Sequence, residues 1–312
     1  MKRPTDLLFA WLILVVLVCI NVEANQIVGW GFNNEGQITI PNGLSNAVSI
    51  SASEMGSFAT RADGTVVAWG DNTCGRTNVP KGLSNVVQVV SGENHCVALK
   101  TDGTITAWGL SNPVSNRLSN VHMLASGRWH GLALLSNGTV TAWGGLGVVN
   151  GKAILGGPER VPKGLSNVVQ VATGACHSLA LQSNGTVIAW GYNEAGQTDV
   201  PAGLSNVVKI AGGWFHSIAV RADGSVVAWG SNNYGQTNVP SGLNNVIDVA
   251  GGHFYSIALR ADGTVVSWGD QTNSPVPIGL SNVVAIAAGE FHNLALIDDK
   301  SPGKPKYHFQ TR

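Results

Sequence analysis

The dipeptide Trp-Gly recurs seven times along the chain at nearly constant spacing. Its tryptophans are Trp30, Trp69, Trp108, Trp143, Trp190, Trp229 and Trp268, separated by 39, 39, 35, 47, 39 and 39 residues. A period near 40 residues indicates a repeat architecture in which each unit is one supersecondary motif packed against its neighbours. The sequence therefore predicts seven copies of one structural unit.

Each unit contains four short runs with the alternation typical of β-strands, and helical periodicity is absent. An Asp-Gly or Asn-Gly pair separates the second run from the third, as in Asp63-Gly64 and Asn184-Gly185. Such pairs favour tight hairpins in which both central residues have positive φ. We expect an all-β fold, a seven-bladed β-propeller of four-stranded blades.

The two ends of the repeat array are complementary. The first unit has only third and fourth runs, at 27–30 and 37–41, whereas the last has only first and second runs, at 283–289 and 293–297. One blade built from both termini would close the ring and remove its exposed strand edges.

The chain divides into three segments. Residues 1–24 have a basic start, an apolar run of 14 residues and a small-residue pattern ending at Ala24, which predicts a secretory signal peptide. The run is short for a membrane helix, although an uncleaved anchor remains the alternative. The propeller is expected over 25–298, followed by a disordered basic tail over 299–312. We expect a secreted or periplasmic monomer, cleaved near Ala24, without a stable membrane span.

Composition and motifs argue against several function classes. Lys plus Arg and Asp plus Glu number 18 each, so no overall charge attracts nucleic acid. The sequence contains no phosphate loop, metal-binding helix motif or nucleophile elbow, and we expect neither an enzyme nor a cofactor or metal site. Three cysteines remain after the signal segment, so at least one thiol is unpaired. They are Cys74, Cys96 and Cys176.

Histidine occurs at one repeat position in five units, which would spread the imidazoles around a ring. The favoured interpretation is structural, with each buried ring bonded to a neighbouring backbone group. These residues are His95, His130, His177, His216 and His292, with Gly56 and Tyr255 in the other two units.

Recognition is expected on one face of the disc, because connections between alternating strands alternate between two faces. The Asp/Asn-Gly face is nearly identical from unit to unit, whereas the turns before the histidines vary and carry aromatic residues. The candidate partner-binding residues are Arg128, Trp129, Trp214, Phe215, His253, Phe254, Tyr255, Glu290 and Phe291. The alternative is that Phe215, Phe254 and Phe291 only cap the core between blades. A Gly-rich insertion at 144–160 is expected on the same face, and the preceding unit is expected to be shortened around 112–117.

The shared frame resembles the regulator of chromosome condensation repeat, in a short bacterial-type form, over nearly all of residues 27–297. It is seen in full in Leu83-Ser84-Asn85-Val86-Val87, Ser91-Gly92-x-x-His95 and Ala107-Trp108-Gly109. The unit beginning at Trp229-Gly230 is also similar to the repeat of secreted propeller-type β-lactamase inhibitory proteins. That resemblance implies an aromatic face docked over an enzyme's active-site entrance. Trp129, Phe215, Phe254 and Phe291 match its aromatic turn positions, and Met55, Asn94 and Cys176 depart from them.

The leading hypothesis is therefore a secreted, non-catalytic protein that binds another protein through one aromatic face, as an inhibitor would. The resemblance also leaves guanine-nucleotide exchange as an alternative, against which export and the lack of a long hairpin insertion argue. A third hypothesis is glycan binding, because sugar rings stack on Trp and Tyr.

Overall fold

Within each repeat, three consecutive apolar runs form an antiparallel sheet. The computed structural model describes residues 26–298, apart from 111–113, 115–117, 145–147, 150–151, 154–156, 158 and 273–274. In these residues the strands form seven three-stranded sheets, or blades, and one short two-stranded ribbon.

The blades are numbered along the chain. Blade 1 comprises β2 (Ala47–Ala52), β3 (Gly56–Arg61) and β4 (Val66–Gly70); blade 2, β5 (Val86–Ser91), β6 (His95–Lys100) and β7 (Ile105–Gly109); blade 3, β8 (Val121–Ser126), β9 (His130–Leu135) and β10 (Val140–Gly144); blade 4, β13 (Val168–Thr173), β14 (His177–Gln182) and β15 (Val187–Gly191); blade 5, β16 (Val207–Gly212), β17 (His216–Arg221) and β18 (Val226–Gly230); blade 6, β19 (Val246–Gly251), β20 (Tyr255–Arg260) and β21 (Val265–Gly269); blade 7, β22 (Val283–Ala288), β23 (His292–Ile297) and β1 (Gln26–Gly31). The ribbon consists of β11 (Val148–Val149) and β12 (Lys152–Ala153).

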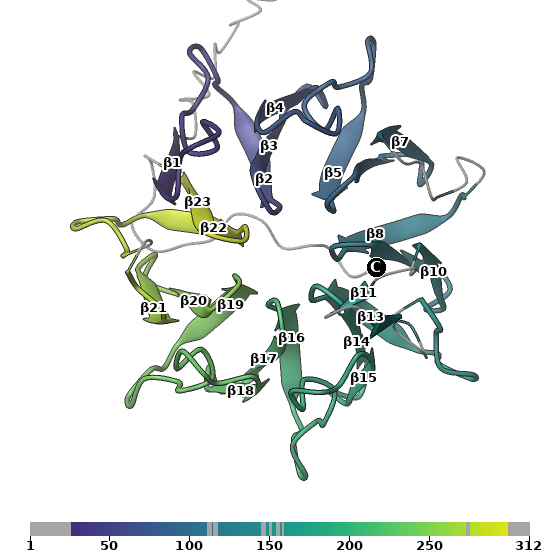
Figure 1. The fold of residues 1–312 in the computed structure, drawn as a ribbon, viewed down its shortest axis with the longest axis vertical. Coiled ribbons are helices and arrows are strands. Elements are labelled where there is room, and N and C mark those ends of the chain that lie inside the picture. Colours follow the sequence, from purple (N-terminus) through teal and green to yellow (C-terminus); the bar gives the residue numbers. More distant parts are fainter. Residues whose placement is uncertain are drawn as a thin grey trace, which may run out of the picture.

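The blades stand around a central axis, as Figure 1 shows. The first strand of each blade contacts the first strands of both neighbouring blades, so these seven strands surround the axis. Blade 7 joins the two termini, because β1 pairs with β23 from Gln26↔Ile297 to Gly31↔His292. The seven-bladed propeller and its closure by both termini are confirmed.

The expected fourth strand of each blade is not regular β-structure in the described residues. In the first such segment the Thr39 amide donates to the Gly36 carbonyl at 3.0 Å, and the Ile38 amide donates to the Asn33 side chain at 3.0 Å. Gly36 has a φ of 76°. The outer segment is therefore a chain of turns whose amide groups are satisfied locally rather than by a strand partner.

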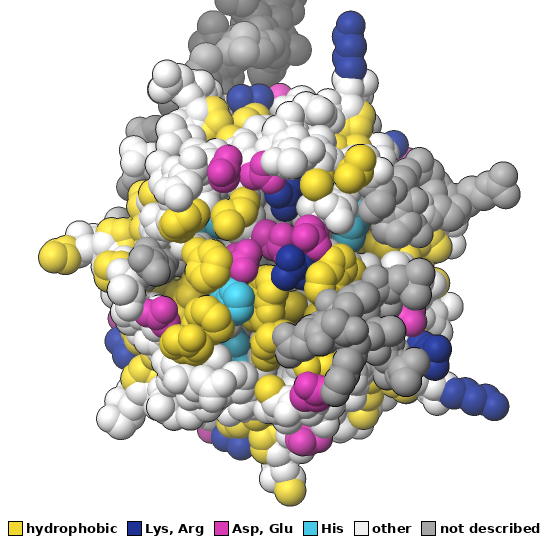
Figure 2. Space-filling view, in the orientation of Figure 1, with side chains coloured by type: hydrophobic (Ala, Val, Ile, Leu, Met, Phe, Trp, Pro, Cys, Tyr) yellow, Lys and Arg dark blue, Asp and Glu magenta, His cyan; other side chains and the backbone are white. Residues whose placement is uncertain are grey.

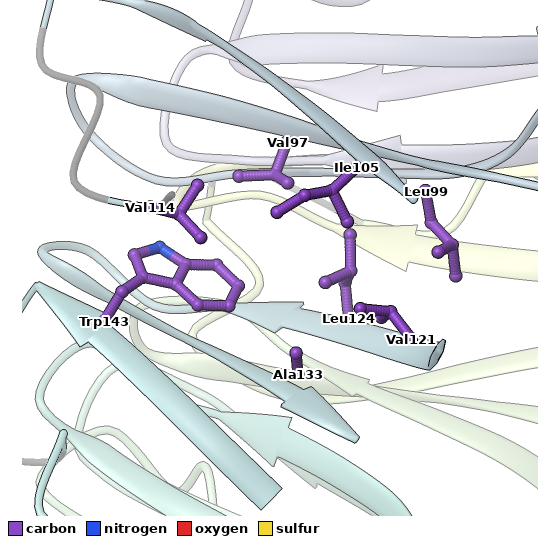
Figure 3. Packing of buried hydrophobic residues seen from close by; sticks show 8 residues of the cluster. All are labelled: Val97, Leu99, Ile105, Val114, Val121, Leu124, Ala133 and Trp143. Carbon is purple, nitrogen blue, oxygen red and sulfur yellow. The ribbon is translucent and has the colours of Figure 1, made fainter. Parts of the chain in front are cut away.

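Apolar clusters lie between neighbouring blades. Figure 3 shows the one between blades 2 and 3, where Val97 and Ile105 face Leu124 and the ring of Trp143. All seven Trp-Gly tryptophans are at most 9% exposed. Four of their indoles donate to a carbonyl of an outer segment, as Trp69 does to Gln37 at 2.9 Å. The indole thus fixes the outer segment to the next blade.

The repeated histidines form a second connection between blades. His177 and His216 each place Nε2 2.9 Å from a serine hydroxyl of the following blade, Ser217 and Ser256. The pairs His130–Ser178, His292–Ser57 and His95–Ser126 have the same character. The structural interpretation fits this arrangement, with a serine hydroxyl group as the partner of Nε2. The expected backbone contacts are found for His130, with His177, and for His292, with Gly56. Burial lowers the pKa of these imidazoles from 6.5 to about 3 or 4.

Several sequence predictions lie outside the described residues: the signal segment 1–24, the tail from 299, most of the shortened unit at 112–117 and much of the insertion at 144–160. Among the residues that are described, no helix is long and apolar enough to cross a membrane.

Candidate functional site

The turns between the first and second strands of all blades emerge on one face, which we call the aromatic face. Each lies beside the loop that follows Trp-Gly, since the Ser231 amide donates to the Phe215 carbonyl at 2.8 Å and Asp270 to Phe254 at 3.0 Å. The Asp/Asn-Gly turns instead contact the start of the first strand of the next blade. For example, the Val246 amide donates to the Gly224 carbonyl at 3.1 Å. The two sets of connections therefore occupy opposite faces.

Eight of the nine candidate residues lie in the turns of the aromatic face and are half-buried there. The exception is Tyr255, which is 3% exposed. It occupies the repeated histidine position, and its hydroxyl donates across the blade 6–blade 7 interface to the carbonyls of Gly289 and His292, at 3.2 and 3.0 Å. The prediction of Tyr255 as a surface residue is wrong, because this position points between blades.

Each turn has two side chains ahead of the histidine position. The first of them form the axial ring: Glu54, Glu93, Arg128, Ala175, Trp214, His253 and Glu290. The second form the outer ring: Met55, Asn94, Trp129, Cys176, Phe215, Phe254 and Phe291. Residues of all seven blades line one depression of about 120 Å³, among them Glu54, Arg128, Trp214, His253 and Glu290. Because every blade contributes to its lining, this depression lies on the propeller axis, and we call it the axial depression.

Arg128 is held at the axis by two carboxylates and two indoles. Its Nε and Nη2 donate to the two carboxylate oxygens of Glu93 at 3.1 Å each, and its Nε lies 3.1 Å from Oε1 of Glu54. The guanidinium carbon is 4.6 Å from the ring centroid of Trp129 and 4.8 Å from that of Trp214. Trp129 also donates its indole N–H to Glu93. A planar guanidinium can make both kinds of contact at once.

The two glutamates beside Arg128 have different protonation behaviour. Burial raises the pKa of Glu54 to about 7, with Arg128 opposing the rise and Glu93 and Glu290 adding to it. The hydrogen bond from Arg128 holds the pKa of Glu93 below its usual value. Glu93 is thus the stable counter-ion of Arg128, and Glu54 is a carboxyl group that titrates near neutral pH.

Aromatic rings continue from the axis outward over blades 5, 6 and 7. Trp214 and His253 stack with centroids 4.1 Å apart and planes 10° apart, and His253 lies 3.8 Å from Phe254 and 5.2 Å from Phe291. His253 Nδ1 is 2.9 Å from Glu290 Oε1, which orients the imidazole. In Figure 2, apolar side chains surround a histidine beside the charged group at the centre of the face.

Three further rings extend this cluster and were not predicted from the sequence. They come from the loops after Trp-Gly: Tyr234 lies 4.1 Å from Phe254, Tyr192 5.7 Å from Phe215, and Phe32 6.3 Å from Phe291. The loops after Trp-Gly and the turns between the first and second strands lie side by side because they connect strands on the same face. The alternation of strand direction in the sequence could therefore have predicted that these rings join the cluster. Tyr234 is 51% exposed.

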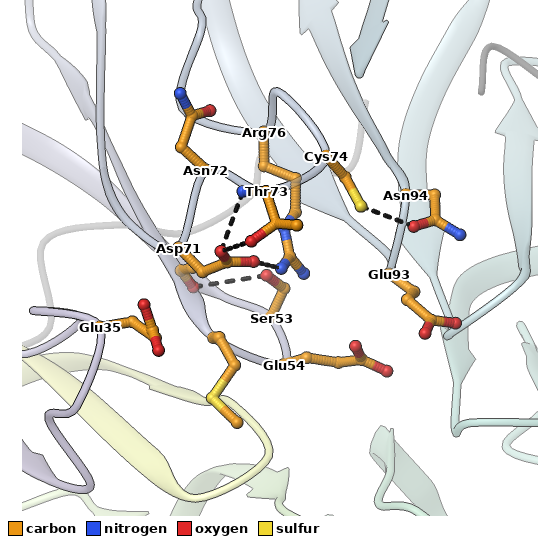
Figure 4. A network of polar contacts seen from close by, with 12 residues as sticks. Glu35, Ser53, Glu54, Asp71, Asn72, Thr73, Cys74, Arg76, Glu93 and Asn94 are labelled. Carbon is orange, nitrogen blue, oxygen red and sulfur yellow. Dashed lines mark hydrogen bonds and ion pairs between the residues drawn. The ribbon is translucent and has the colours of Figure 1, made fainter. Parts of the chain in front are cut away.

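Blades 1 and 2 place a network of polar side chains on the same face, part of which is drawn in Figure 4. Arg76 replaces the glutamine that other repeats place after the loop glycine; it is 4% exposed and forms an ion pair with Asp71. Cys74 Sγ lies 2.8 Å from Asn94 Oδ1. Glu54 and Glu93 project beside this group, so blades 1 and 2 contribute polar and charged side chains to the face, where blades 5 to 7 contribute most of the aromatic rings.

The described residues do not combine into a recognisable catalytic group. His253 with Glu290 has the geometry of an oriented base, but its neighbours on the other sides are the rings of Trp214, Phe254 and Phe291. No group of three or more metal-ligating side chains occurs in this part of the chain.

Comparison with known proteins agrees with the architecture. Four segments, 86–112, 168–197, 207–236 and 246–274, match the model described as regulator of chromosome condensation (RCC1) repeat. Comparison with curated protein sequences gives no match.

Solved structures share the fold at low identity. Prp20p from Saccharomyces cerevisiae is 19% identical with a TM-score of 0.69, and the match covers 89% of this chain and 93% of that chain. Human WBSCR16 is 18% identical with a TM-score of 0.67, covering 89% and 100%. The ectodomain of the Physcomitrella patens receptor kinase CR4 is 20% identical with a TM-score of 0.64, covering 83% and 71%. The chain thus shares the seven-bladed propeller fold of these structures, and RCC1 repeats match in blades 2, 4, 5 and 6.

Proposed function

We propose that this chain is a non-catalytic, protein-binding propeller whose partner docks on the aromatic face. The observation that carries the proposal is the continuous set of half-buried rings from Trp129 through Trp214, Phe254 and Phe291, with Arg128 held among them. Trp, Tyr and Arg dominate the energetics of protein interfaces. The repeated turns of the opposite face lack such differentiation.

The comparison structures support protein binding as the class of function. The yeast structure is described together with binding of Prp20p to Gsp1p and histones, and another structure holds yeast RCC1 (Prp20) bound to Kap60. Those partners belong to those proteins. For this chain, the N-terminal segment 1–24 supports export, so we propose a secreted or periplasmic partner, and an enzyme that the propeller inhibits is the form suggested by the sequence resemblance.

The experiment compares capture by three immobilised proteins spanning residues 25–312: the parent, Trp214→Ala and Asp102→Ala. Extracellular and periplasmic proteins are passed over each, and retained proteins are quantified by mass spectrometry. A true partner is retained by the parent and by Asp102→Ala, which lies on the opposite face, and is lost with Trp214→Ala.

The affinity of the identified partner should fall by about 2 kcal/mol or more in Trp214→Ala, as at an interface hot spot. The melting temperature should change little, because Trp214 lies in a surface turn and not between blades. A partner that binds Trp214→Ala as tightly as the parent contradicts the proposal. Retention of glycans instead of proteins would favour the carbohydrate-binding alternative.

A further inference from the structure

Charge is distributed unequally between the two faces. Outside the 144–160 insertion, the described turns and loops of the aromatic face carry eight carboxylates and two arginines: Glu35, Glu54, Asp71, Glu93, Glu194, Asp199, Asp270 and Glu290, with Arg76 and Arg128. The turns and strand ends of the opposite face carry six cations and five carboxylates: Arg61, Lys81, Lys100, Lys163, Arg221 and Arg260, with Asp63, Asp102, Asp223, Asp262 and Asp298. Among these described residues, the aromatic face has six more carboxylates than cations (8 − 2), whereas the opposite face has one more cation than carboxylates (6 − 5).

Both arginines of the aromatic face are already engaged within it. Arg76 is buried against Asp71, and Arg128 is shared between Glu54 and Glu93. The charge of each guanidinium is therefore already balanced by a carboxylate of the same face. An approaching partner therefore meets a negative potential that a basic surface would complement, which accelerates encounter and selects against acidic proteins.

The axial depression concentrates this charge at one point. Glu54, Glu290 and Arg128 line it together with Trp214 and His253, so its wall joins two carboxylates and one cation to the stacked rings. At about 120 Å³ it is much smaller than the roughly 300 Å³ or more of a typical small-molecule pocket, but it can receive the end of one side chain.

Resting on the proposed function of this face, we infer that the partner inserts a lysine or arginine side chain into the axial depression. The cationic end would lie between the carboxylates of Glu54 and Glu290. The aliphatic stem would contact the edge of the Trp214 indole, because His253 and Arg128 already lie over that ring. Carboxylates form charge-assisted hydrogen bonds with such a cationic end. The surrounding aromatic residues would contact apolar surface on the partner.

The probe is Nα-acetyl-lysine N-methylamide, which keeps the charged ε-ammonium group. The matched control is Nα-acetyl-norleucine N-methylamide, which lacks that ammonium group. Binding is followed by NMR through the indole N–H of Trp214, assigned with Trp214→Phe. A saturable shift is expected with the lysine compound in the millimolar range and none with the norleucine compound. Affinity should be higher at pH 8 than at pH 6, as Glu54 ionises among Arg128, Glu93, Glu290 and Arg76, with the His253–Glu290 pair alongside.

Variants separate charge recognition from a structural effect. Glu54→Gln and Glu290→Gln should each weaken lysine binding at least threefold, whereas Glu194→Gln, an exposed carboxylate on the same face but outside the depression, should not. At a pH high enough to keep Glu54 ionised in both proteins, Arg128→Gln should tighten binding, because it removes the competing cation. A merely structural role predicts that it weakens binding like the glutamate variants.

Equal shifts with both compounds, weaker binding in Arg128→Gln, or a saturable response to Ca²⁺ with none to the lysine compound would each overturn the inference. The proposed function fails independently, when a partner binds Trp214→Ala normally. If a partner is lost with Trp214→Ala while the lysine compound does not bind, the docking face stands and the basic anchor is wrong.

Discussion

At the scale of single residues, each repeated histidine joins its own blade to the next one. His216 is fully buried and meets a serine of the following blade at 2.9 Å. In blade 3 the position of this serine is occupied by Gly131, because a Cβ there would lie only 2.1 Å from the Trp143 ring. His95 of blade 2 therefore bonds to another serine of blade 3, Ser126. The contact is therefore maintained where the local sequence changes.

These histidines should make the fold acid-sensitive. Burial lowers their pKa from 6.5 to about 3 or 4, so the unfolded chain binds protons that the folded chain does not. The histidine contribution to stability is complete above pH 6.5 and is lost as the pH falls toward 4, at about 1.4 kcal/mol per pH unit for each histidine. Glu54, with its raised pKa, acts in the opposite direction but is a single group. Exposed turn aspartates such as Asp102 and Asp223 have lowered pKa values and act only at lower pH.

Urea unfolding at pH 7.5, 6 and 5 measures this effect. The midpoint should fall steeply between pH 6 and 5 in the parent and in His122→Gln, which changes an exposed histidine, and less steeply in His216→Gln. A midpoint independent of pH over this range is incompatible with neutral, buried imidazoles.

At the scale of elements, the Asp/Asn-Gly pairs are turns, but not of the expected type. Gly64 has a φ of 77°, whereas Asp63 is not among the non-glycine residues with positive φ. The turn is longer than a two-residue hairpin: the Arg61 amide donates to the Thr65 carbonyl at 2.9 Å, and the Asp63 side chain accepts from the Thr65 amide at 2.9 Å. A residue pair indicates that a turn exists, but loop length decides its geometry.

The left-handed non-glycine residues lie instead at the asparagine that enters each blade, from Asn46 to Asn282, with φ between 54° and 58°. The carbonyl of Asn206 accepts from the Ala222 amide at 2.8 Å, which holds this conformation. Asn tolerates positive φ better than residues with larger or β-branched side chains.

We therefore expect Asn206→Ala to lower the free energy of unfolding by about 1 kcal/mol, and Asn206→Gly to leave it nearly unchanged. Chemical denaturation of both variants decides between backbone strain and a side-chain role. Equal losses of unfolding free energy in the two variants would show that the side-chain amide of Asn206, rather than its positive φ, stabilises the start of blade 5.

At the scale of the whole molecule, periodicity alone predicted the number of blades and the closure, because both depend on counting repeats. It also predicted which connections share a face. It could not predict the site in full: Glu54, Glu93 and Arg128 belong to three blades and meet only at the axis. Acidic turn residues are ordinary in a sequence, and only ring closure places them around one guanidinium.

Closure of the ring is also the property on which stability of the whole disc depends. Deleting residues 25–41 removes β1, which pairs with β23 through six residues, and the outer segment whose Gln37 carbonyl accepts from both Ser57 and Trp69. Blade 7 would keep two strands with an open edge, and blade 1 would lose two hydrogen bonds at its interface.

The truncated chain should therefore aggregate, or unfold cooperatively at a much lower temperature than the protein spanning residues 25–312. It should not lose blade 7 alone while the other blades stay folded. Size-exclusion chromatography and thermal unfolding of the two proteins provide the measurement, with a chain lacking only 299–312 as the control for shortening itself. A soluble, monomeric 42–312 protein with an unchanged melting temperature would mean that each blade is stable with its immediate neighbours alone. The seam between β1 and β23 would then be a local contact and not the joint that holds the axial ring together.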